Sequence, residues 1–305
     1  MADTPKVRAL DPALLDSLSG LSLVARTVVE GYMAGQHRSP HRGSSVEFAQ
    51  HREYVHGDEM RHIDWKIFAK SDRLVVKEFV EETNFDCHFL VDASESMAFQ
   101  SGKRSKFDYA RWCAASLAHL VLSQRDASGL VVFDEEVRAK VPPGNGPAQR
   151  ADMIRVLEEA QPSGQTGMGE VLKWMATRIP RKSIVVVLSD FFDEPEKIVE
   201  GLRRLSFAGH EPILMQILDP QEVNFDFSGL HRLDGLEGGG KLKIDARAIR
   251  EAYLDELKAH HAVLDRHTRA LSIDFVQMTT DTGLDVALST YLAHRSSRAR
   301  GGARS

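Results

Sequence analysis

The sequence predicts an α/β fold, in which a mostly parallel open sheet is flanked by helices, together with a smaller N-terminal module. From residue 87 onward, short apolar segments of strand length alternate with longer segments of helical periodicity. The segment 183–189 is almost entirely apolar, as is typical of parallel strands covered on both faces. Polar and glycine-rich turns separate these segments, so the alternation indicates successive strand and helix units.

Residues 1–82 form the expected N-terminal module. Apolar residues at helical spacing predict its first helix, and alternation of apolar and polar residues predicts its strand. The expected elements are a helix over 14–33, a loop-rich segment over 36–58, a short helix from its N-cap Asp58 to Lys70, and a strand over 74–80.

Residues 83–294 form the expected sheet domain. Its second and third strands are close in sequence and indicate a hairpin at the sheet edge. The stretch 221–244 predicts irregular structure, in which the glycines 238–240 indicate a turn between short strands. The segment 295–305, with four arginines and no acid, predicts a disordered basic tail. The expected strands are 87–91, 129–133, 137–141, 183–189, 212–218 and 272–277, and the expected helices are 106–122, 148–160, 169–179, 195–208, 246–270 and 283–293.

Composition excludes some classes of function. The 305 residues carry a formal net charge of −5, which gives no electrostatic case for binding nucleic acid or an anionic membrane. No apolar run approaches the roughly 20 residues needed to span a bilayer. Cys87 and Cys113 both lie among apolar residues and indicate buried thiols rather than a disulfide framework. We therefore expect a cytoplasmic protein without direct membrane insertion.

One carboxylate and two hydroxyls follow the apolar strand 87–91. Asp92, Ser94 and Ser96 alternate along the chain, so their oxygens can point into one space. Oxygen ligands of this kind suit Mg²⁺ or Mn²⁺. Alone, the pattern is equally typical of a turn or a helix cap.

Two further polar segments are expected to converge on Asp92. In an open α/β sheet, ligands bind beyond the carboxyl ends of strands, where the strand order reverses. Thr166 lies in a glycine-rich loop, and Asp190 follows the apolar strand 183–189. These five residues could surround a metal ion and leave one position open for water or a partner carboxylate.

The pattern Asp-x-Ser-x-Ser, then Thr, then Asp resembles the metal-ion-dependent adhesion site of von Willebrand factor A (vWA) domains, which have a Rossmann-like fold. The resemblance implies that Ser94, Ser96 and Thr166 bind the metal directly and that Asp92 and Asp190 do so directly or through water. It also implies that an acidic side chain of a partner fills the open position. Where many vWA domains have glycine after the last aspartate, this chain has Phe191.

A second resemblance covers nearly all of the chain and points to the bacterial family called domain of unknown function 58. It implies a co-chaperone or adaptor that works with a MoxR-type AAA+ ATPase on an unidentified client protein. The residues that carry this resemblance are Arg52, Tyr54, Gly57, Asp58, Arg61, Ile63, Asp64, Trp65, Ala69 and Lys70, followed by the Asp92 motif.

The segment from Arg52 to Trp65 has two interpretations. Its charged residues can form local ion pairs and helix caps, while Trp65 buries its ring against the sheet domain. Alternatively, Arg52, Arg61 and Trp65 form a partner-binding face, because Arg and Trp are favoured at protein interfaces.

Enzymatic interpretations have less support in the sequence. The chain contains neither a Gly-x-x-x-x-Gly-Lys-Ser/Thr phosphate loop nor a Gly-x-Ser-x-Gly nucleophile turn. We therefore assign no catalytic residues. A Mg²⁺-dependent hydrolase, either a phosphatase or a nuclease, is the alternative, because a metal held by Asp92 and Asp190 could activate water.

Overall fold

The computed structural model describes residues 21, 48–55, 63–79, 86–227, 230–234 and 241–288. The chain forms two compact units, residues 38–84 and residues 1–37 together with 85–305. The sequence predicted a boundary after residue 82, and the second segment of the larger unit begins at residue 85. Of the first 37 residues, only Leu21 is described; it is helical and buried, and its backbone N donates to Glu158 Oε1 at 3.2 Å.

The larger unit contains a six-stranded sheet with the order β10-β7-β6-β3-β4-β5. All neighbouring strands are parallel except β4 and β5, which form the expected antiparallel hairpin at one edge. The predicted fold class is therefore confirmed. The strands are β3 (Asp86–Asp92), β4 (Ala127–Phe133), β5 (Val137–Gly144), β6 (Ser183–Ser189), β7 (Glu211–Leu218) and β10 (Asp274–Thr279).

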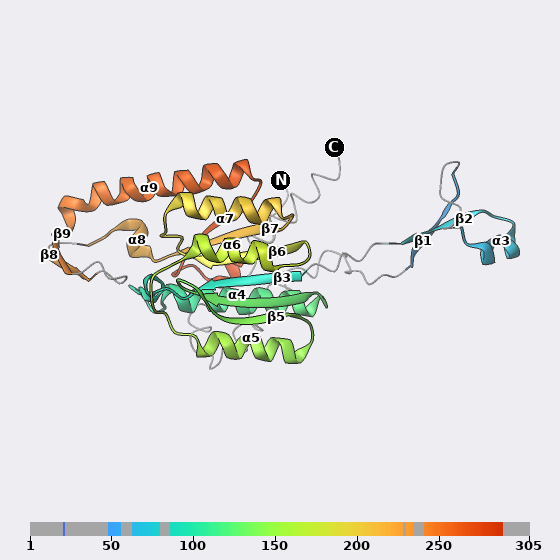
Figure 1. The fold of residues 1–305 in the computed structure, drawn as a ribbon, viewed down its shortest axis with the longest axis horizontal. Coiled ribbons are helices and arrows are strands. Elements are labelled where there is room, and N and C mark those ends of the chain that lie inside the picture. The colour runs from blue at the N-terminus through green and yellow to red at the C-terminus, as the bar shows by residue number, and fades with distance from the viewer. Residues whose placement is uncertain are drawn as a thin grey trace, which may run out of the picture. The chain divides into compact units, whose positions relative to one another are not determined.

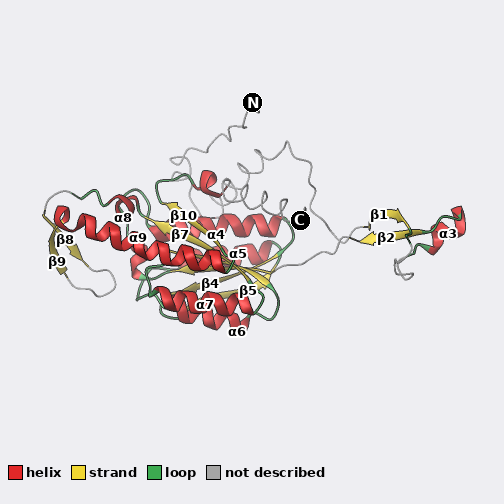
Figure 2. Cartoon of the chain, turned by 90° about the horizontal axis from the view of Figure 1, so that it is seen from above, coloured by secondary structure: helices red, strands yellow, loops and turns green. Residues whose placement is uncertain are grey.

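Helices cover both faces of this sheet (Figures 1 and 2). On one face, α4 and α5 pack over Phe89 and Val91 of β3, whereas α6, α7 and α9 pack over Leu90 on the other face. This alternation follows from the period of two in a strand, and it explains why the central strands are apolar throughout. The helices are α4 (Lys106–Ser123), α5 (Pro147–Glu159), α6 (Met168–Arg178), α7 (Pro195–Phe207) and α9 (Ala246–Ala270).

One sequence prediction in the larger unit is only partly right. The stretch 221–244, expected to be irregular apart from short strands around its glycines, overlaps two paired strands, β8 (Leu230–Asp234) and β9 (Lys241–Asp245), and also the short helix α8 (Pro220–Asn224), which was not expected. Asp219 caps α8 in a capping box, in which its side chain accepts from Gln221 N and Glu222 Oε2 accepts from Asp219 N. The last helix begins at 284, and its expected part beyond 288 lies outside the described residues, as does the expected tail over 295–305.

The smaller unit contains β1 (Phe48–Glu53), α3 (Trp65–Ser71) and β2 (Val75–Phe79). β1 pairs antiparallel with β2, so the expected loop over 36–58 is wrong where β1 forms, and the expected strand over 74–80 is confirmed. The N-cap of α3 is Asp64 rather than Asp58, because Asp64 Oδ1 accepts from Lys66 N and Ile67 N at 3.0 and 3.3 Å. Apart from Leu21, the expected helix over 14–33 lies outside the described residues.

Candidate metal centre

The candidate site lies at the carboxyl end of β3 and β6, the two central strands of the sheet. These strands pair in parallel, with Val91 opposite Leu188. In the sheet, β3 lies between β4, the next strand in the sequence, and β6. The strand order therefore reverses between β3 and β6, which is where open α/β sheets form their ligand sites.

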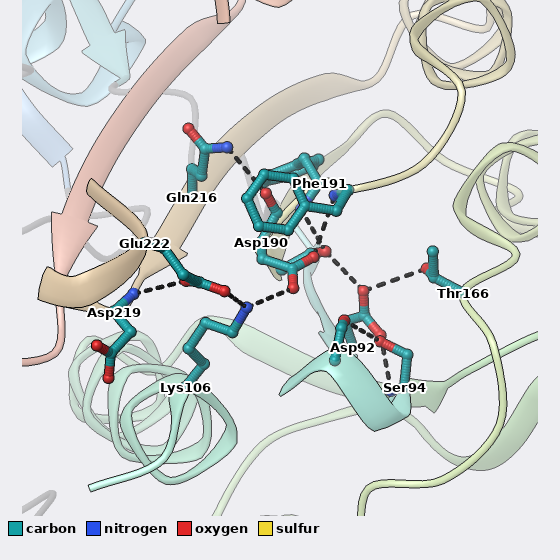
Figure 3. A network of polar contacts seen from close by, with 12 residues as sticks. Asp92, Ser94, Lys106, Thr166, Asp190, Phe191, Gln216, Asp219 and Glu222 are labelled. Atoms are coloured by element: carbon teal, nitrogen blue, oxygen red, sulfur yellow. Dashed lines mark hydrogen bonds and ion pairs between the residues drawn. The ribbon is translucent and has the colours of Figure 1, made fainter. Parts of the chain in front are cut away.

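Asp92 is the centre of a cluster of hydroxyl groups (Figure 3). Its Oδ1 accepts from Ser94 N at 2.9 Å, and its Oδ2 accepts from Ser189 Oγ at 2.6 Å and from Thr166 Oγ1 at 3.3 Å. Ser94 Oγ and Ser96 Oγ lie 3.1 Å apart. Four of the five predicted ligands thus lie together, and Ser189, which was not predicted as a site residue, joins them.

The Asp92 carboxylate has no cationic partner within the described residues. Its side chain is fully buried, and all the donors that contact it are neutral. Burial and, to a lesser extent, the nearby charge of Asp190 raise the pKa of Asp92 to about 7, against the lowering effect of the hydrogen bonds. A buried carboxylate in this state favours either a proton or a cation.

The loop that carries Thr166 is fixed by backbone contacts on both sides. Ser163 N donates to Ala93 O at 2.8 Å, and Gly167 N donates to Asp134 O at 2.9 Å. A Cβ atom at Gly167 would lie 2.4 Å from the carbonyl oxygen of Glu135, so only glycine allows this approach. The glycines therefore position the threonine hydroxyl against Asp92, as their pattern in the sequence predicted.

Asp190 has a different partner. Its Oδ2 accepts from Lys106 Nζ at 2.7 Å, and the same ammonium donates to Glu222 Oε1 at 2.6 Å (Figure 3). Asp190 Oδ1 accepts from Phe192 N at 3.1 Å. Gln216 Nε2 donates to the backbone oxygen of Asp190 at 2.8 Å. The fifth predicted ligand thus lies beside the others, but an ion pair engages its carboxylate.

Opposing effects act on the ion pair. Burial alone would lower the pKa of Lys106, but the carboxylates of Asp190 and Glu222 outweigh burial, so that the pKa is raised above its ordinary value. Burial raises the pKa of Glu222, and the Lys106 ammonium opposes that rise. Lys106 is therefore a fully charged ammonium at neutral pH, held between two acids.

Sequence reasoning missed Lys106 and Glu222 as members of the site. Lysine at the first position of an amphipathic helix is normally solvated, so nothing in the local pattern predicts its burial. Glu222 lies in the stretch expected to be irregular. A capping-box pattern, in which Asp219 is followed three positions later by Glu222, could have predicted the short helix that carries Glu222.

Phe191 adopts the left-handed backbone conformation, with a φ of 59°. This conformation favours glycine, because a Cβ atom strains it. Here the ring is fully buried and meets Phe275 edge to face, with ring centroids 6.4 Å apart, and Phe191 N donates to Ser189 Oγ at 2.9 Å. Burial and this hydrogen bond offset the backbone strain.

The donor set fits a hard divalent cation. Within the described part of the chain, no group of three or more His, Cys, Asp or Glu side chains could hold a metal ion. The Asp92 cluster is of another kind, because hydroxyl groups supply most of its oxygens. Hydroxyl and carboxylate oxygens suit Mg²⁺ and Mn²⁺. Asp92, Ser94, Ser96 and Thr166 would hold such an ion, which would supply a site for an anionic oxygen.

The smaller unit carries the residues that the sequence suggested as a partner-binding face. Arg52 lies in β1, and Arg61 lies outside the described residues. Trp65 is 57% exposed and meets Phe68 edge to face, with ring centroids 6.1 Å apart. The partner-binding role of Arg52, Arg61 and Trp65 stays a prediction.

The sheet topology and the hydroxyl-rich cluster together define a vWA-like α/β protein. The chain belongs to the family described as protein of unknown function DUF58, which matches residues 50–263. Uncharacterized proteins of Mycobacterium tuberculosis, Rv1480, and of Mycobacterium bovis, Mb1516, are each 26% identical over 291 residues, which cover 93% of this chain and 90% of each relative.

Among solved structures, the chain is similar to the conserved hypothetical protein BatB from Bacteroides thetaiotaomicron. The sequence identity is 14%, the match covers 70% of this chain and 99% of that one, and the TM-score is 0.48. It is also similar to the VWA domain of SpRpn10, at 10% identity and a TM-score of 0.42, over 68% of this chain and 94% of that one. None of the described helices has the length and apolar character needed to cross a bilayer.

Proposed function

We propose that this protein is a metal-dependent protein-binding adaptor. Mg²⁺ or Mn²⁺ held by Asp92, Ser94, Ser96 and Thr166, with Asp190 beside them, captures an acidic side chain of a partner protein. The observation that carries the proposal is the buried Asp92 carboxylate surrounded by neutral hydroxyl groups, without a cation of its own among the described residues.

The chemistry of the donor set supports capture of a carboxylate. Neutral hydroxyl ligands withdraw little of the positive charge of a dication, so the ion keeps a strong attraction for a further anionic oxygen. Two of the hydroxyls, those of Ser94 and Ser96, lie on the segment immediately after β3. Ser94 is buried whereas Ser96 is partly exposed, so the cluster extends from the core to the surface.

The resemblance to MoxR-associated proteins supplies the proposed partner. We assign a MoxR-type AAA+ ATPase as the coupled enzyme, with a client protein that the pair remodels in the cytoplasm. The exposed Trp65 of the smaller unit offers a second contact surface for this assembly, since exposed tryptophan is a frequent interface anchor.

A quantitative pull-down from native cytoplasm tests this proposal. The baits are the wild type, Asp92→Ala, and Asp86→Ala as a matched control at the opposite end of the same strand. Each is used with Mg²⁺ and with EDTA, after circular dichroism confirms folding. We expect an AAA+ ATPase to bind the wild type and Asp86→Ala only with Mg²⁺, and to be lost with Asp92→Ala.

Two results contradict the adaptor. Identical proteins on every bait, with and without metal, would show that the cluster does not determine binding; Trp65→Ala would then test the smaller unit. Phosphatase or nuclease turnover by the purified protein, abolished by Asp92→Asn, would instead favour the Mg²⁺-dependent hydrolase.

A further inference from the structure

Lys106 is the first residue of α4, yet only 1% of its side chain is exposed. Its ammonium bridges two acids from distant parts of the sequence, Asp190 after β6 and Glu222 in α8. The rings of Phe192 and Phe99 lie close to the ammonium, with centroids 5.2 and 5.9 Å from Nζ. Three chain segments thus enclose one buried positive charge next to the candidate metal centre.

Burying this ion pair costs desolvation energy, and a well-packed apolar group in its place is often no less stable. Stability alone therefore does not explain a lysine here. The position of the lysine has a second effect. Its ammonium contacts Asp190, the one predicted metal ligand that lies outside the hydrogen-bonded cluster around Asp92. Asp190 Oδ2 accepts from Lys106 Nζ and Oδ1 accepts from Phe192 N, so each oxygen already has a donor, and one of these donors is charged.

We infer that Lys106 is a positioning residue of the candidate metal centre, which holds Asp190 out of direct coordination. A bound Mg²⁺ or Mn²⁺ then has Asp92 as its direct carboxylate ligand. This inference rests on the proposed function, because it concerns the same site. It goes beyond that function by assigning Lys106 and Glu222 a role in the affinity of the site for metal.

The consequence is a site that binds metal less tightly but attracts a partner carboxylate more strongly. Each anionic ligand removed from a dication increases the ion's attraction for the next anion. Glu222 shares the ammonium with Asp190 and so limits how firmly Lys106 holds that ligand. Lys106 and Glu222 therefore change metal affinity in opposite directions.

Mn²⁺ binding to the full chain, followed by electron paramagnetic resonance, tests this inference without any partner. Lys106→Met should bind Mn²⁺ about tenfold or more tightly, because a unit positive charge has left a partly buried site. Asp190 then enters the coordination sphere, so water proton relaxation should report about one fewer inner-sphere water. Glu222→Gln should bind Mn²⁺ several-fold more weakly, with the water count of the wild type.

Two controls make the result specific. Lys197→Met removes the same charge from an exposed lysine, 52% exposed and paired with Glu194, and should leave Mn²⁺ affinity within about twofold of the wild type. Lys106→Met/Asp92→Ala should lose the tight binding, which shows that the ion does not sit in the space vacated by the ammonium.

Unchanged or weaker Mn²⁺ binding by folded Lys106→Met, or tight binding by the double variant, overturns the inference while the metal centre itself stands. If Lys106→Met does not fold, Glu222→Gln decides: weaker binding supports the inference, and equal or tighter binding overturns it. Absence of binding in the wild type and in every variant overturns both proposals. Binding only by Lys106→Met supports the role of the lysine and overturns the proposed function.

Discussion

Asp92 is the last residue of β3, and Asp190 follows the neighbouring strand β6, but their carboxylates have different partners. Asp92 is surrounded by neutral donors from Ser94, Thr166 and Ser189, whereas Asp190 is paired with the ammonium of Lys106. Both side chains are fully buried. The difference teaches that burial alone does not define a ligand: Asp190 has a counter-charge, whereas Asp92 has none among the described residues.

The largest expected effect comes from removing the internal counter-charge. Lys106→Met leaves Asp190 and Glu222 buried without a cation, and should lower the free energy of unfolding by about 3–5 kcal/mol. Urea unfolding at pH 7.5 in EDTA measures it. The exposed pair of Lys197 provides the control, whose loss should cost less than about 1 kcal/mol. A similarly small loss for Lys106→Met would mean that the two acids are solvated or protonated.

Removing the charge of Asp92 should instead raise the free energy of unfolding. The pKa of Asp92 is raised from 3.8 to about 7 in the folded state. Between these values the folded chain retains a proton that the unfolded chain has lost, so stability falls as pH rises, by up to about 4 kcal/mol above pH 7. Asp92→Asn should therefore stabilise the metal-free chain at pH 8.

Urea midpoints at pH 5 and pH 8 in EDTA measure this effect, with Asp86→Asn at the start of the same strand as the control. The advantage of Asp92→Asn should shrink at pH 5, where the wild-type carboxyl is largely protonated. An Asn variant that is less stable than the wild type at pH 8 would show that Asp92 has a counter-charge in the metal-free protein.

Mg²⁺ binding should supply a counter-charge to Asp92 and so stabilise the folded protein. Mg²⁺ at 100 times its dissociation constant should raise the free energy of unfolding of the wild type by about 2.7 kcal/mol and leave Asp92→Asn unchanged. Thermal unfolding with and without Mg²⁺ measures this difference. Equal stabilisation of both chains would locate the metal elsewhere.

The smallest expected change in metal-free stability concerns Thr166. Thr166→Val keeps the side-chain shape and removes the Oγ1 donor, which lies 3.3 Å from Asp92 Oδ2, so it should cost no more than about 1 kcal/mol. Its effect on Mg²⁺ affinity, measured by calorimetry, should be about tenfold or more. Unaltered affinity would exclude this hydroxyl from the metal ligands.

Much of the sheet domain was predictable, because its signals are local. The apolar run of β6 and the helical periodicity of α9 predicted both elements, α9 to the residue. Smaller elements were missed: β1 contains only two apolar residues, Phe48 and Ala49, and α8 is a single capped turn. Short segments such as these depend on pairing and packing that local periodicity does not contain.

The same distinction applies to the candidate site. Asp92, Ser94 and Ser96 are neighbours in sequence, and the sheet topology brings Thr166 to them, so a motif could predict their cluster. Lys106 reaches Asp190 across 84 positions, and its buried ammonium also contacts a second acid, which α8 supplies. A charged residue at a helix start predicts solvent exposure, and only tertiary packing reverses that expectation.

Gly167 offers a criterion for comparing relatives of this chain. A Cβ atom at Gly167 would lie 2.4 Å from the Glu135 carbonyl oxygen, so the requirement is steric and independent of which ion or partner is bound. A homologue that keeps the acidic and hydroxyl residues but replaces this glycine must move its threonine loop away from the β4–β5 hairpin. An alignment would then still show the motif, although the threonine hydroxyl no longer lay beside the aspartate.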